Sequence, residues 1–495
     1  MFKKILIANR GEIASRVART CHEMGIATVA VYSDADFSSP HVHAAQEAVH
    51  LGPAPATASY LNVDAILQAA KQTGAEAIHP GYGFLSENAA FARRVEAAGL
   101  TFIGPSPHSL EAVGNKIFAR QTVAKLGVPV IPALENPSSD PAVLHEQAQT
   151  LGYPLLIKAA AGGGGKGMRI VRQEKDLADA VAAAQREATA AFADGTVYLE
   201  RYLERPRHIE VQILGDKHGA LIHLGERECS IQRRYQKILE ETPSPAVSAE
   251  LRSQMTTAAL KVAKAAGYYN AGTVEFILDA EGRFYFLEVN ARLQVEHPIT
   301  EWITRLDLVR EQIRIAAGEH LGLRQEDVQT KGHAFECRIY AEDPANGFFP
   351  SPGKILAWRA PLGPGIRVDA GVEQHTEVSV YYDPLIAKFS TWGQDREQAR
   401  KRMEAALRQS VVLGPTTNVE FLLDLIAHPA FMSGETHTGF LTEHFSQWQP
   451  QQRTQLLEAA LAAVLGQSVT SRTEATPQAG PETPWQRLGG WRMGA

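Results

Sequence analysis

The sequence is poor in cysteine and has no long apolar run, and both absences restrict the kind of protein it encodes. The three cysteines, Cys21, Cys229 and Cys337, lie far apart, which fits neither a disulfide framework nor a zinc-binding spacing. Such usage is typical of a reducing compartment, so we expect a cytoplasmic protein. No apolar stretch approaches the roughly 20 residues that span a bilayer, so we expect no membrane partner.

An excess of positive charge is also missing, because 55 acidic residues outnumber 49 lysines and arginines and give a net charge of −6. We therefore expect no nucleic-acid partner. The apolar run at residues 5–8 is cut short by the polar residues 9–12, so a signal peptide is not expected. A length of 495 residues, 44% of them hydrophobic, is typical of a globular protein of about three domains.

Residues 3–35 predict a strand–helix–strand unit, with strands at 5–8 and 28–32 around a helix at 13–24. This is the arrangement of a Rossmann-like α/β domain, although Gly11 is the only glycine in the first turn. Helices and strands continue to alternate along the chain. We therefore predict an N-terminal α/β domain over residues 1–113.

Residues 114–203 predict a second, smaller α+β unit that carries a glycine-rich loop. A strand ending in Lys158 leads into Gly162–Gly165 and a second lysine, and strand-like residues follow. A glycine-rich loop between two strands, flanked by lysines, predicts a mobile lid over phosphates. A phosphate-binding helix start and a plain flexible hairpin are the alternatives. The Walker spacing is not met, because Ala160 and Gly167 occupy two of its required positions.

Residues 273–290 predict a β-hairpin whose polar side chains suit a metal ion. Unbroken alternation in its second strand would place Glu288 and Asn290 on the same face as Phe284. Glu275, in the first strand, can lie close to Glu288 across the hairpin. Two carboxylates and an amide oxygen are ligands that Mg²⁺ or Mn²⁺ prefers. A salt-bridged surface hairpin is the alternative interpretation.

Four further charged residues lie before or after the hairpin in the sequence. Arg292 and Glu296 come directly after it, Arg338 lies on a predicted strand at 333–340, and Lys237 lies in a basic segment. Together with a phosphate lid and a metal site, these bases predict phosphoryl transfer to an oxygen acceptor, with Glu296 as a candidate base. A structural pair of Glu296 with Arg292 and a charged surface loop around Lys237 are the alternatives.

The rest of the chain divides into a large mixed domain over residues 204–445 and a helix-and-linker tail over 446–495. Residues 466–485 are rich in serine, threonine, proline, glycine and glutamine, which is typical of a linker. So short a segment after a linker predicts a longer natural chain, or a partner domain that lies elsewhere.

Seven segments, in order along the chain, resemble the biotin carboxylase component of biotin-dependent acyl-CoA carboxylases, which forms the N-terminal region of their α subunits. The resemblance runs from residue 1 to about 445. It implies an ATP-grasp fold that combines α/β and α+β parts, with a Rossmann-like N-terminal domain, a mobile glycine-rich lid and a large mixed C-terminal domain. The segments are residues 7–14, 79–88, 162–165, 207–212, 232–234, 292–298 and 382–384.

The resemblance implies an ATP-dependent ligase that uses ATP, Mg²⁺ (or Mn²⁺) and bicarbonate to carboxylate biotin through carboxyphosphate. The implied catalytic residues are Glu296, Arg292, Arg338 and Lys237. The implied nucleotide contacts are Lys116, Lys158, Gly162, Gly163, Gly164, Gly165, Glu200, Arg201, Leu203, His208, Gln232, Tyr235, Glu275 and Glu288. The implied metal ligands are Glu275, Glu288 and Asn290. The implied contacts of bicarbonate and biotin are Lys237, Arg292, Gln294, Val295, Arg338 and Tyr82.

Three positions depart from the family pattern. Tyr235 stands where many relatives have histidine, Ala161 where some have a further glycine, and Arg201 where lysine is common. The first places one nucleotide contact in doubt, the second predicts a slightly stiffer lid, and the third leaves a backbone contact to adenine possible.

No Met-Lys-Met biotin-attachment motif is present. The resemblance therefore implies biotin that is free or carried by a biotin carboxyl carrier domain or protein. It also implies a carboxyltransferase subunit that selects the acyl-CoA (propionyl-, methylcrotonyl-, geranyl- or acetyl-CoA), and a homodimer or larger complex. Two other hypotheses remain: an ATP-grasp ligase that activates an acid for attack by an amine, and a non-catalytic nucleotide-binding regulator.

Overall fold

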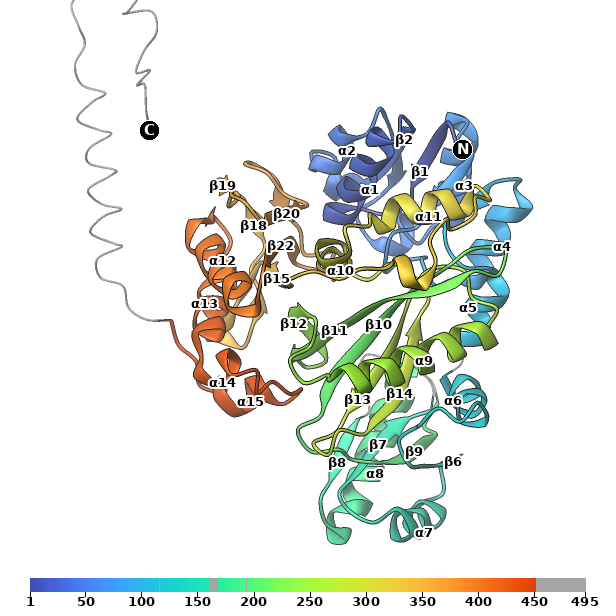
Figure 1. Ribbon diagram of the computed structural model, residues 1–495, viewed down its shortest axis with the longest axis vertical. Helices are drawn as coiled ribbons and strands as arrows, with labels where there is room; N and C mark the ends of the chain where they lie inside the picture. Colours follow the sequence, from blue (N-terminus) through green and yellow to red (C-terminus); the bar gives the residue numbers. More distant parts are fainter. Residues whose placement is uncertain (115, 161–167, 193, 451–495) are drawn as a thin grey trace, which may run out of the picture. The chain divides into compact units, whose positions relative to one another are not determined.

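Three large sheets organise the structure, one parallel and two antiparallel (Figure 1). A computed structural model of the protein describes residues 1–114, 116–160, 168–192 and 194–450. Residues Met1–Trp448 form one unit of internal contacts. The division at residues 113, 203 and 445 remains a prediction, and the predicted helix and linker beyond residue 450 lie outside the described residues.

The N-terminal sheet is parallel, and its five strands run in the order β3-β2-β1-β4-β5. Its apolar strands are buried on both faces, as parallel strands usually are: Leu6 and Val29 pack toward α3 and α4, whereas Ile5 and Ile7 pack toward α1. The predicted strand–helix–strand unit is confirmed. The elements are β1 (Lys4–Ile7), α1 (Gly11–Glu23), β2 (Ala27–Ser33), α2 (Pro40–Ala44), β3 (Glu47–Gly52), α3 (Val63–Thr73), β4 (Ala77–His79), α4 (Ala89–Ala97), β5 (Thr101–Phe102) and α5 (Pro107–Gly114).

The second sheet has four antiparallel strands in the order β6-β9-β7-β8 and its own small apolar core around Leu155, Ile157 and Leu199. The strands on either side of the glycine run pair with each other, with Ile157 opposite Arg169. The predicted strands of the lid are therefore confirmed, while Gly162–Gly165 lie outside the described residues. The elements are α6 (Lys116–Lys125), β6 (Ala133–Ser138), α7 (Pro141–Leu151), β7 (Leu155–Ala159), β8 (Arg169–Val171), α8 (Leu177–Phe192) and β9 (Val197–Arg201).

The third sheet has eight antiparallel strands in the order β14-β13-β10-β11-β12-β15-β22-β20. Its principal elements are β10 (Arg207–Gly215), β11 (Leu221–Arg233), β12 (Gln236–Thr242), α9 (Ala249–Ala265), β13 (Asn270–Leu278), β14 (Phe284–Asn290), α10 (His297–Thr304), α11 (Leu308–Ala316), β15 (His333–Tyr340), β20 (Ile366–Ala370), β22 (Leu385–Gly393), α12 (Arg396–Gln409), α13 (Val419–Ala427), α14 (Pro429–Met432) and α15 (Phe440–His444).

Shorter strands flank this sheet in two-stranded pairs. They are β16 (Glu342–Asp343), β17 (Phe349–Pro350), β18 (Gly353–Lys354), β19 (Ala357–Arg359), β21 (Glu377–Val378) and β23 (Val411–Leu413).

The large sheet is two-faced at strand β10, because its side chains alternate between two environments. Ile209, Val211 and Ile213 share one apolar cluster with residues of α9. The intervening residues Glu210 and Gln212 are also fully buried, but they face the opposite side. Helix α10 packs against β11, β12 and β15 (Figure 1), and Thr300 of this helix accepts from Arg227 on the polar face.

A β-bulge corrects the predicted alternation in β14. Phe286 lies opposite Phe276, but the register shifts by one residue, and Glu288 then lies opposite Glu275. Phe284 and Phe286 consequently join the apolar core, whereas Glu288 shares the face of Glu275. The prediction that Phe284 and Glu288 share one face is therefore wrong, because the extra residue of a bulge inverts the pattern that follows it. The predicted proximity of Glu275 and Glu288 is confirmed.

Across the described ranges, no helix combines the length and apolar character needed to cross a membrane.

Candidate active site

The ammonium group of Lys237 lies among three buried carboxylates on the polar face of the large sheet. Lys237 Nζ donates to Glu210 Oε2 at 2.5 Å, Glu296 Oε1 at 2.6 Å and Glu275 Oε1 at 3.0 Å. The three acids come from β10, the residue before α10, and β13. The alternative interpretation, that Lys237 lies in a charged surface loop, is therefore wrong.

The charges of this cluster set its protonation. Burial alone would raise the pKa of Glu296, but Lys237 and Arg338 outweigh burial and hold that pKa well below its usual range. Burial would likewise lower the pKa of Lys237, yet the surrounding acids raise it well above its ordinary value. Both groups are therefore ionised at neutral pH.

Arg338 bridges Glu296 and a further buried acid. Its Nε donates to Glu240 Oε1 at 2.6 Å, and one terminal nitrogen donates to Glu296 Oε2 at 3.0 Å. Glu296 thus sits between Lys237 and Arg338. A structural pair of Glu296 with Arg292, the alternative raised by the sequence, is not among the ion pairs of the described residues.

Arg292 forms a separate arm at the end of the hairpin. Its Nε donates to Glu87 Oε2 at 3.0 Å, and its terminal nitrogens donate to Gln294 Oε1 at 2.8 Å and Asn290 Oδ1 at 2.9 Å. Gln294 in turn donates to Glu275 Oε1 at 3.0 Å. These contacts join the Arg292 arm to the Lys237 cluster.

The predicted metal ligands form a donor set of the right chemistry. Glu275 and Glu288 are paired in register, and Asn290 is the last residue of β14. Carboxylate and amide oxygens fit Mg²⁺ or Mn²⁺, although Asn290 Oδ1 here accepts from Arg292. His208 Nε2 lies 2.9 Å from Glu275 Oε2, so the oxygen that Lys237 and Gln294 do not contact also has a nitrogen close to it.

The predicted nucleotide contacts come together only in part. Lys158 Nζ of β7 donates to Glu200 Oε1 of β9 at 2.9 Å, which brings two of them together on the lid sheet. Gln232 lies 2.7 Å from His208 Nδ1, which joins another two on the large sheet. Lys116 begins helix α6, and its side chain lies outside the described part of the chain.

The remaining predicted nucleotide contacts lie at the edges of the site. Arg201 is exposed at the end of β9, and Leu203 is half-buried just beyond it. Tyr235 is 58% exposed and has a φ of 68° in the turn between β11 and β12. A left-handed φ is costly for a residue with a large side chain. The charged and titratable neighbours of Tyr235 are Lys158 and Tyr202, so the turn places this side chain near a predicted phosphate contact and outside the carboxylate cluster.

Two predicted substrate contacts lie beside a buried lysine. The carbonyl oxygen of Val295 accepts from Lys388 Nζ at 2.6 Å, and Lys388 Nζ is also 3.2 Å from Glu12 Oε1. The hydroxyl of Tyr82 donates to the same carboxylate of Glu12. Lys388 of β22 therefore fixes the main chain at Val295, and Glu12 of α1 fixes the hydroxyl of Tyr82.

Several residues of the site were missed by sequence reasoning. Arg120 donates to Glu200 at 3.1 Å, and Arg227, which is fully buried, donates to Glu210 at 2.5 Å. The polar alternation of residues 208–212 was a usable signal for Glu210. Long-range partners such as Arg227 carry no local signal of this kind. The other missed residues are Glu12, Glu87, Glu240 and Lys388.

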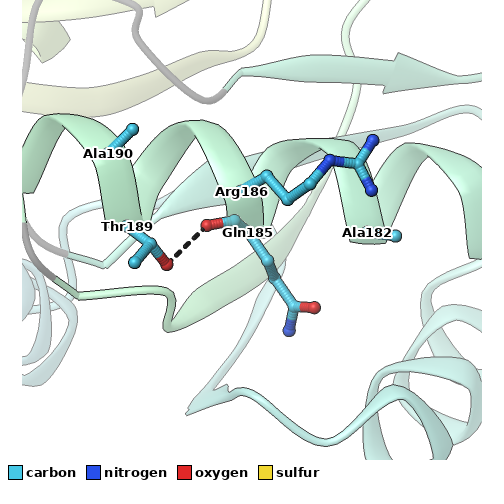
Figure 2. A pocket seen from close by; sticks show the side chains of 5 residues that line it. All are labelled: Ala182, Gln185, Arg186, Thr189 and Ala190. Atoms are coloured by element: carbon cyan, nitrogen blue, oxygen red, sulfur yellow. Dashed lines mark hydrogen bonds between the residues drawn. The ribbon is translucent and has the colours of Figure 1, made fainter.

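A shallow hollow over helix α8 lies apart from these groups (Figure 2). In it the Thr189 hydroxyl donates to the Gln185 carbonyl at 2.8 Å, which is an ordinary bond within a helix. Its lining residues all come from this one helix and include no predicted site residue, so it is not the candidate active site. They are Ala182, Gln185, Arg186, Thr189 and Ala190.

The lid sheet carries Lys158 and Glu200, and the larger antiparallel sheet carries the paired carboxylates Glu275 and Glu288. This combination defines the class of protein as an ATP-grasp ligase. Comparisons with known families agree. "Biotin carboxylase, N-terminal domain" matches residues 1–110, "Carbamoyl-phosphate synthase L chain, ATP binding domain" matches 115–324, and "Biotin carboxylase C-terminal domain" matches 336–443. The chain belongs to the biotin carboxylase family, whose members are ATP-dependent ligases.

Individual relatives support this assignment. Biotin carboxylase 1 of Bacillus subtilis is 51% identical over 442 residues, which cover 89% of this chain and 98% of that protein. The alpha subunit of mitochondrial methylcrotonoyl-CoA carboxylase from Dictyostelium discoideum is 49% identical over 491 residues, which cover 99% of this chain and 70% of that protein. The rice protein of the same name is covered over 60% of its length.

Solved structures agree in fold. The biotin carboxylase domain dimer of Hydrogenobacter thermophilus 2-oxoglutarate carboxylase, in complex with MgADP, ADP and bicarbonate, gives a TM-score of 0.86 at 47% identity and covers 90% of this chain and 98% of that chain. A biotin carboxylase–β-γ-ATP complex from Campylobacter jejuni gives a TM-score of 0.87 at 43% identity and covers 90% of this chain and 99% of that one.

Proposed function

We propose that the protein uses ATP and bicarbonate to carboxylate biotin, as the first half-reaction of an acyl-CoA carboxylase. The observation that carries the proposal is Glu296, an ionised acid fixed between Lys237 and Arg338. An acid held between two cations, close to a further arginine and a metal-type donor set, suits a small anion that must lose a proton. Bicarbonate is such an anion.

The nucleotide would lie between the two antiparallel sheets. Lys158 would contact its phosphates, and Glu200 and Arg120 would hold that lysine in place. Gln232 and His208 would contact it from the large sheet. A divalent cation held by Glu275, Glu288 and Asn290 would supply neutralisation of phosphate charge. Asn290 can bind the cation only if the hydrogen bond from Arg292 to Asn290 Oδ1 breaks. Bound bicarbonate would break that bond by accepting from Arg292 instead.

Bicarbonate would be held by Lys237, Arg292, Gln294 and the main-chain amide of Val295. Lys237 and Arg338 hold the pKa of Glu296 well below its usual range, which makes Glu296 a weak base in the resting site. Once bicarbonate engages Lys237, that pKa rises, and Glu296 becomes able to accept the bicarbonate proton. The γ-phosphoryl group then passes to bicarbonate to form carboxyphosphate, which breaks down to CO₂ and phosphate.

Biotin would be carboxylated next to Arg338. The released phosphate would take the N1 proton of biotin, and the N1 so exposed would attack CO₂. Arg338 would stabilise the enolate form of biotin by opposing its charge, and its two acidic partners would hold the guanidinium in the required orientation. Tyr82, held by Glu12, would border the biotin site.

We further propose methylcrotonoyl-CoA as the final acyl acceptor, because the Dictyostelium relative aligns over 99% of the chain. A pyruvate carboxylase component from Methanothermobacter thermautotrophicus, at 51% identity over 444 residues, keeps other acceptors open. A biotin carboxyl carrier domain or protein and a carboxyltransferase subunit would be the partners. A homodimer is proposed by analogy with the 2-oxoglutarate carboxylase domain, which was solved as a dimer.

The activity is tested by ADP release from ATP and Mg²⁺, with bicarbonate and free biotin added separately and together. We expect bicarbonate alone to raise the rate and free biotin to raise it further when both are present. A rate that neither compound raises would show that the proposal is wrong. A rate that depends on an amine and not on biotin would favour an amine-using ATP-grasp ligase, and tight ATP binding without turnover would favour a regulator.

The acceptor is tested separately, with the carboxyltransferase and carrier subunits that co-purify with the chain. Transfer of labelled carboxyl to methylcrotonoyl-CoA in preference to propionyl-, acetyl- or geranyl-CoA supports the acceptor. Preferred transfer to another acyl-CoA would leave the biotin carboxylase assignment intact and replace only the acceptor.

A further inference from the structure

Two buried glutamates lie side by side behind Arg338. Glu240 of β12 and Glu336 of β15 are directly paired across the two strands, so their side chains leave the same face of the sheet. Both side chains are fully buried. Acids paired across strands in this way repel each other when both are ionised, and burial increases that cost.

The pair is poorly supplied with hydrogen-bond donors. Within the part of the chain that the structure describes, Glu240 Oε2 and both carboxyl oxygens of Glu336 have no hydrogen-bond partner. The remaining oxygen, Glu240 Oε1, accepts from Arg338 Nε at 2.6 Å. An ionised carboxylate without donors is among the costliest groups to bury, whereas a neutral carboxylic acid costs much less. The geometry therefore favours a proton on Glu336.

The charges around the pair agree with this view. Burial raises the pKa of Glu336 well above its usual range, and Lys388 does not offset it. Burial also raises the pKa of Glu240, to about 7, although Arg338 opposes the shift. The charged and titratable groups that face the pair are Arg338 from β15, Lys237 from β12, Cys229 from β11, Lys388 from β22, Glu12 from α1 and Glu296 just before α10. Cys337 lies between Glu336 and Arg338 on β15 but packs in the apolar cluster on the other face.

We propose that Glu336 is held as a neutral carboxylic acid, and that Glu240 is a positioning residue that fixes Arg338 while ionised and releases it on taking up a proton. Glu240 can ionise because Glu336 is neutral and places no second negative charge beside it on the adjacent strand. The inference rests on the proposed function, in which Arg338 stabilises biotin.

The proposal gives the pH dependence of biotin use a definite sign. Glu240 is protonated below about pH 7 and ionised above it. The KM for free biotin should therefore fall as the pH rises through this value, because ionised Glu240 orients Arg338. A residue with a purely structural role would not move this dependence.

Infrared spectroscopy tests Glu336 without any substrate. Well above neutral pH, where Glu240 is ionised, the full chain should show the C=O stretch of a protonated carboxylic acid, and Glu336→Gln should weaken that band. The matched control is Glu241→Gln. Glu241 is equally buried, but His333 and Arg396 overcome burial and lower its pKa, so its removal should leave the band. Absence of the band from the unsubstituted chain, or a band of unchanged intensity in Glu336→Gln, would overturn the proposal.

Kinetics with free biotin test Glu240. Glu240→Gln keeps the shape of the side chain and removes its charge, so the KM for biotin at neutral pH should rise about tenfold, as expected for one lost charge-assisted hydrogen bond. The fall of KM with rising pH should disappear in Glu240→Gln and persist in Glu241→Gln. Bicarbonate-dependent ATP hydrolysis should change much less.

A wild-type pH dependence in Glu240→Gln, or equal losses in biotin KM and in ATP hydrolysis, would contradict the positioning role. If the unsubstituted chain shows no biotin-dependent turnover at all, the proposed function and the role of Glu240 fail together. The infrared result on Glu336 does not depend on that outcome, so the two failures are distinguishable.

Discussion

Two acidic regions of the same sheet differ in how their charges are balanced. Around Lys237, three carboxylates share one ammonium group, and the pKa values of Glu275 and Glu296 lie well below their usual range because nearby cations outweigh burial. At the Glu240–Glu336 pair, burial dominates and both pKa values are raised. The two regions meet at Arg338, which bonds to Glu240 and Glu296.

The difference shows that burial alone does not decide the ionisation of an acid. The same low-dielectric interior keeps Glu275 and Glu296 charged but favours protons on Glu240 and Glu336. Burial also raises the pKa of Glu210, although Arg227 and Lys237 donate to it. The balance of nearby cations against burial and neighbouring acids therefore makes the distinction. In a site that would bind several anionic substrates, the Lys237 region supplies acids and a lysine whose charges are fixed. The Glu240–Glu336 pair supplies Glu240, which titrates near neutral pH.

The largest effect is expected for Glu296→Ala, which removes the acid that bonds to both Lys237 and Arg338. Bicarbonate-dependent ATP hydrolysis should fall by roughly 10²–10⁴-fold, the usual contribution of a well-placed base. ATP affinity, measured by calorimetry, should be retained, because Glu296 is bonded to Lys237 and Arg338 and not to the lid. A matching loss of ATP affinity would instead give Glu296 a structural role.

Lys237→Met should break the charge-balanced region. The variant leaves three buried acids without their shared cation, so the free energy of unfolding in urea should fall by about 3–5 kcal/mol. Lys401→Met is the control, since Lys401 pairs with Glu397 on an exposed face of α12, and it should cost less than about 0.5 kcal/mol. Equal losses in the two variants would mean that the Lys237 cluster adds no more stability than a surface ion pair.

Arg338→Ala should separate the two half-steps of the reaction. Biotin carboxylation should fall by roughly 10–100-fold, the loss expected for a charged hydrogen bond made in the transition state. ATP hydrolysis that depends on bicarbonate should fall less, because Lys237 and Arg292 remain. The measurement is ADP release with and without free biotin, and proportional losses in both would remove the specific link of Arg338 to biotin.

The smallest effect is expected in thermal stability against pH, where the two kinds of acid should differ in sign. The raised pKa of Glu336 means that its contribution to stability is present at low pH and lost as pH rises above the ordinary value of 4.5. Glu336→Gln should therefore gain in Tm, relative to the unsubstituted chain, between acid and neutral pH, by a few degrees at most.

Glu241→Gln is the matched comparison for this experiment. The lowered pKa of Glu241 gives a contribution that is present above the ordinary value and lost as pH falls. This variant should therefore lose Tm at neutral pH and approach the unsubstituted chain in acid. Parallel Tm curves for the two variants would contradict the distinction between the balanced and the unbalanced acids.

Much of the fold was predictable, because local pattern decides it. The strand predicted at 5–8, the helix predicted at 13–24 and the strands on either side of the glycine run all follow from composition and period. The structure has the first two at Lys4–Ile7 and Gly11–Glu23, and it pairs the strands beside the glycine run. The approach of Glu275 to Glu288 also followed, since a short turn leaves little freedom of register. The bulge in β14 did not, because nothing in the local alternation marks where an extra residue is accommodated.

The chain by itself determined which chemical groups are available: the lysines around the lid, the carboxylates of the hairpin, and Arg292, Glu296 and Arg338. Which of these groups form ion pairs depends on the assembled fold. Lys237 meets Glu210, Glu275 and Glu296, and Glu240 meets Glu336, across long separations in sequence that strand order and packing close. Local propensity acts over a few residues, whereas ion pairs and protonation depend on distances that exist only after the sheet has assembled.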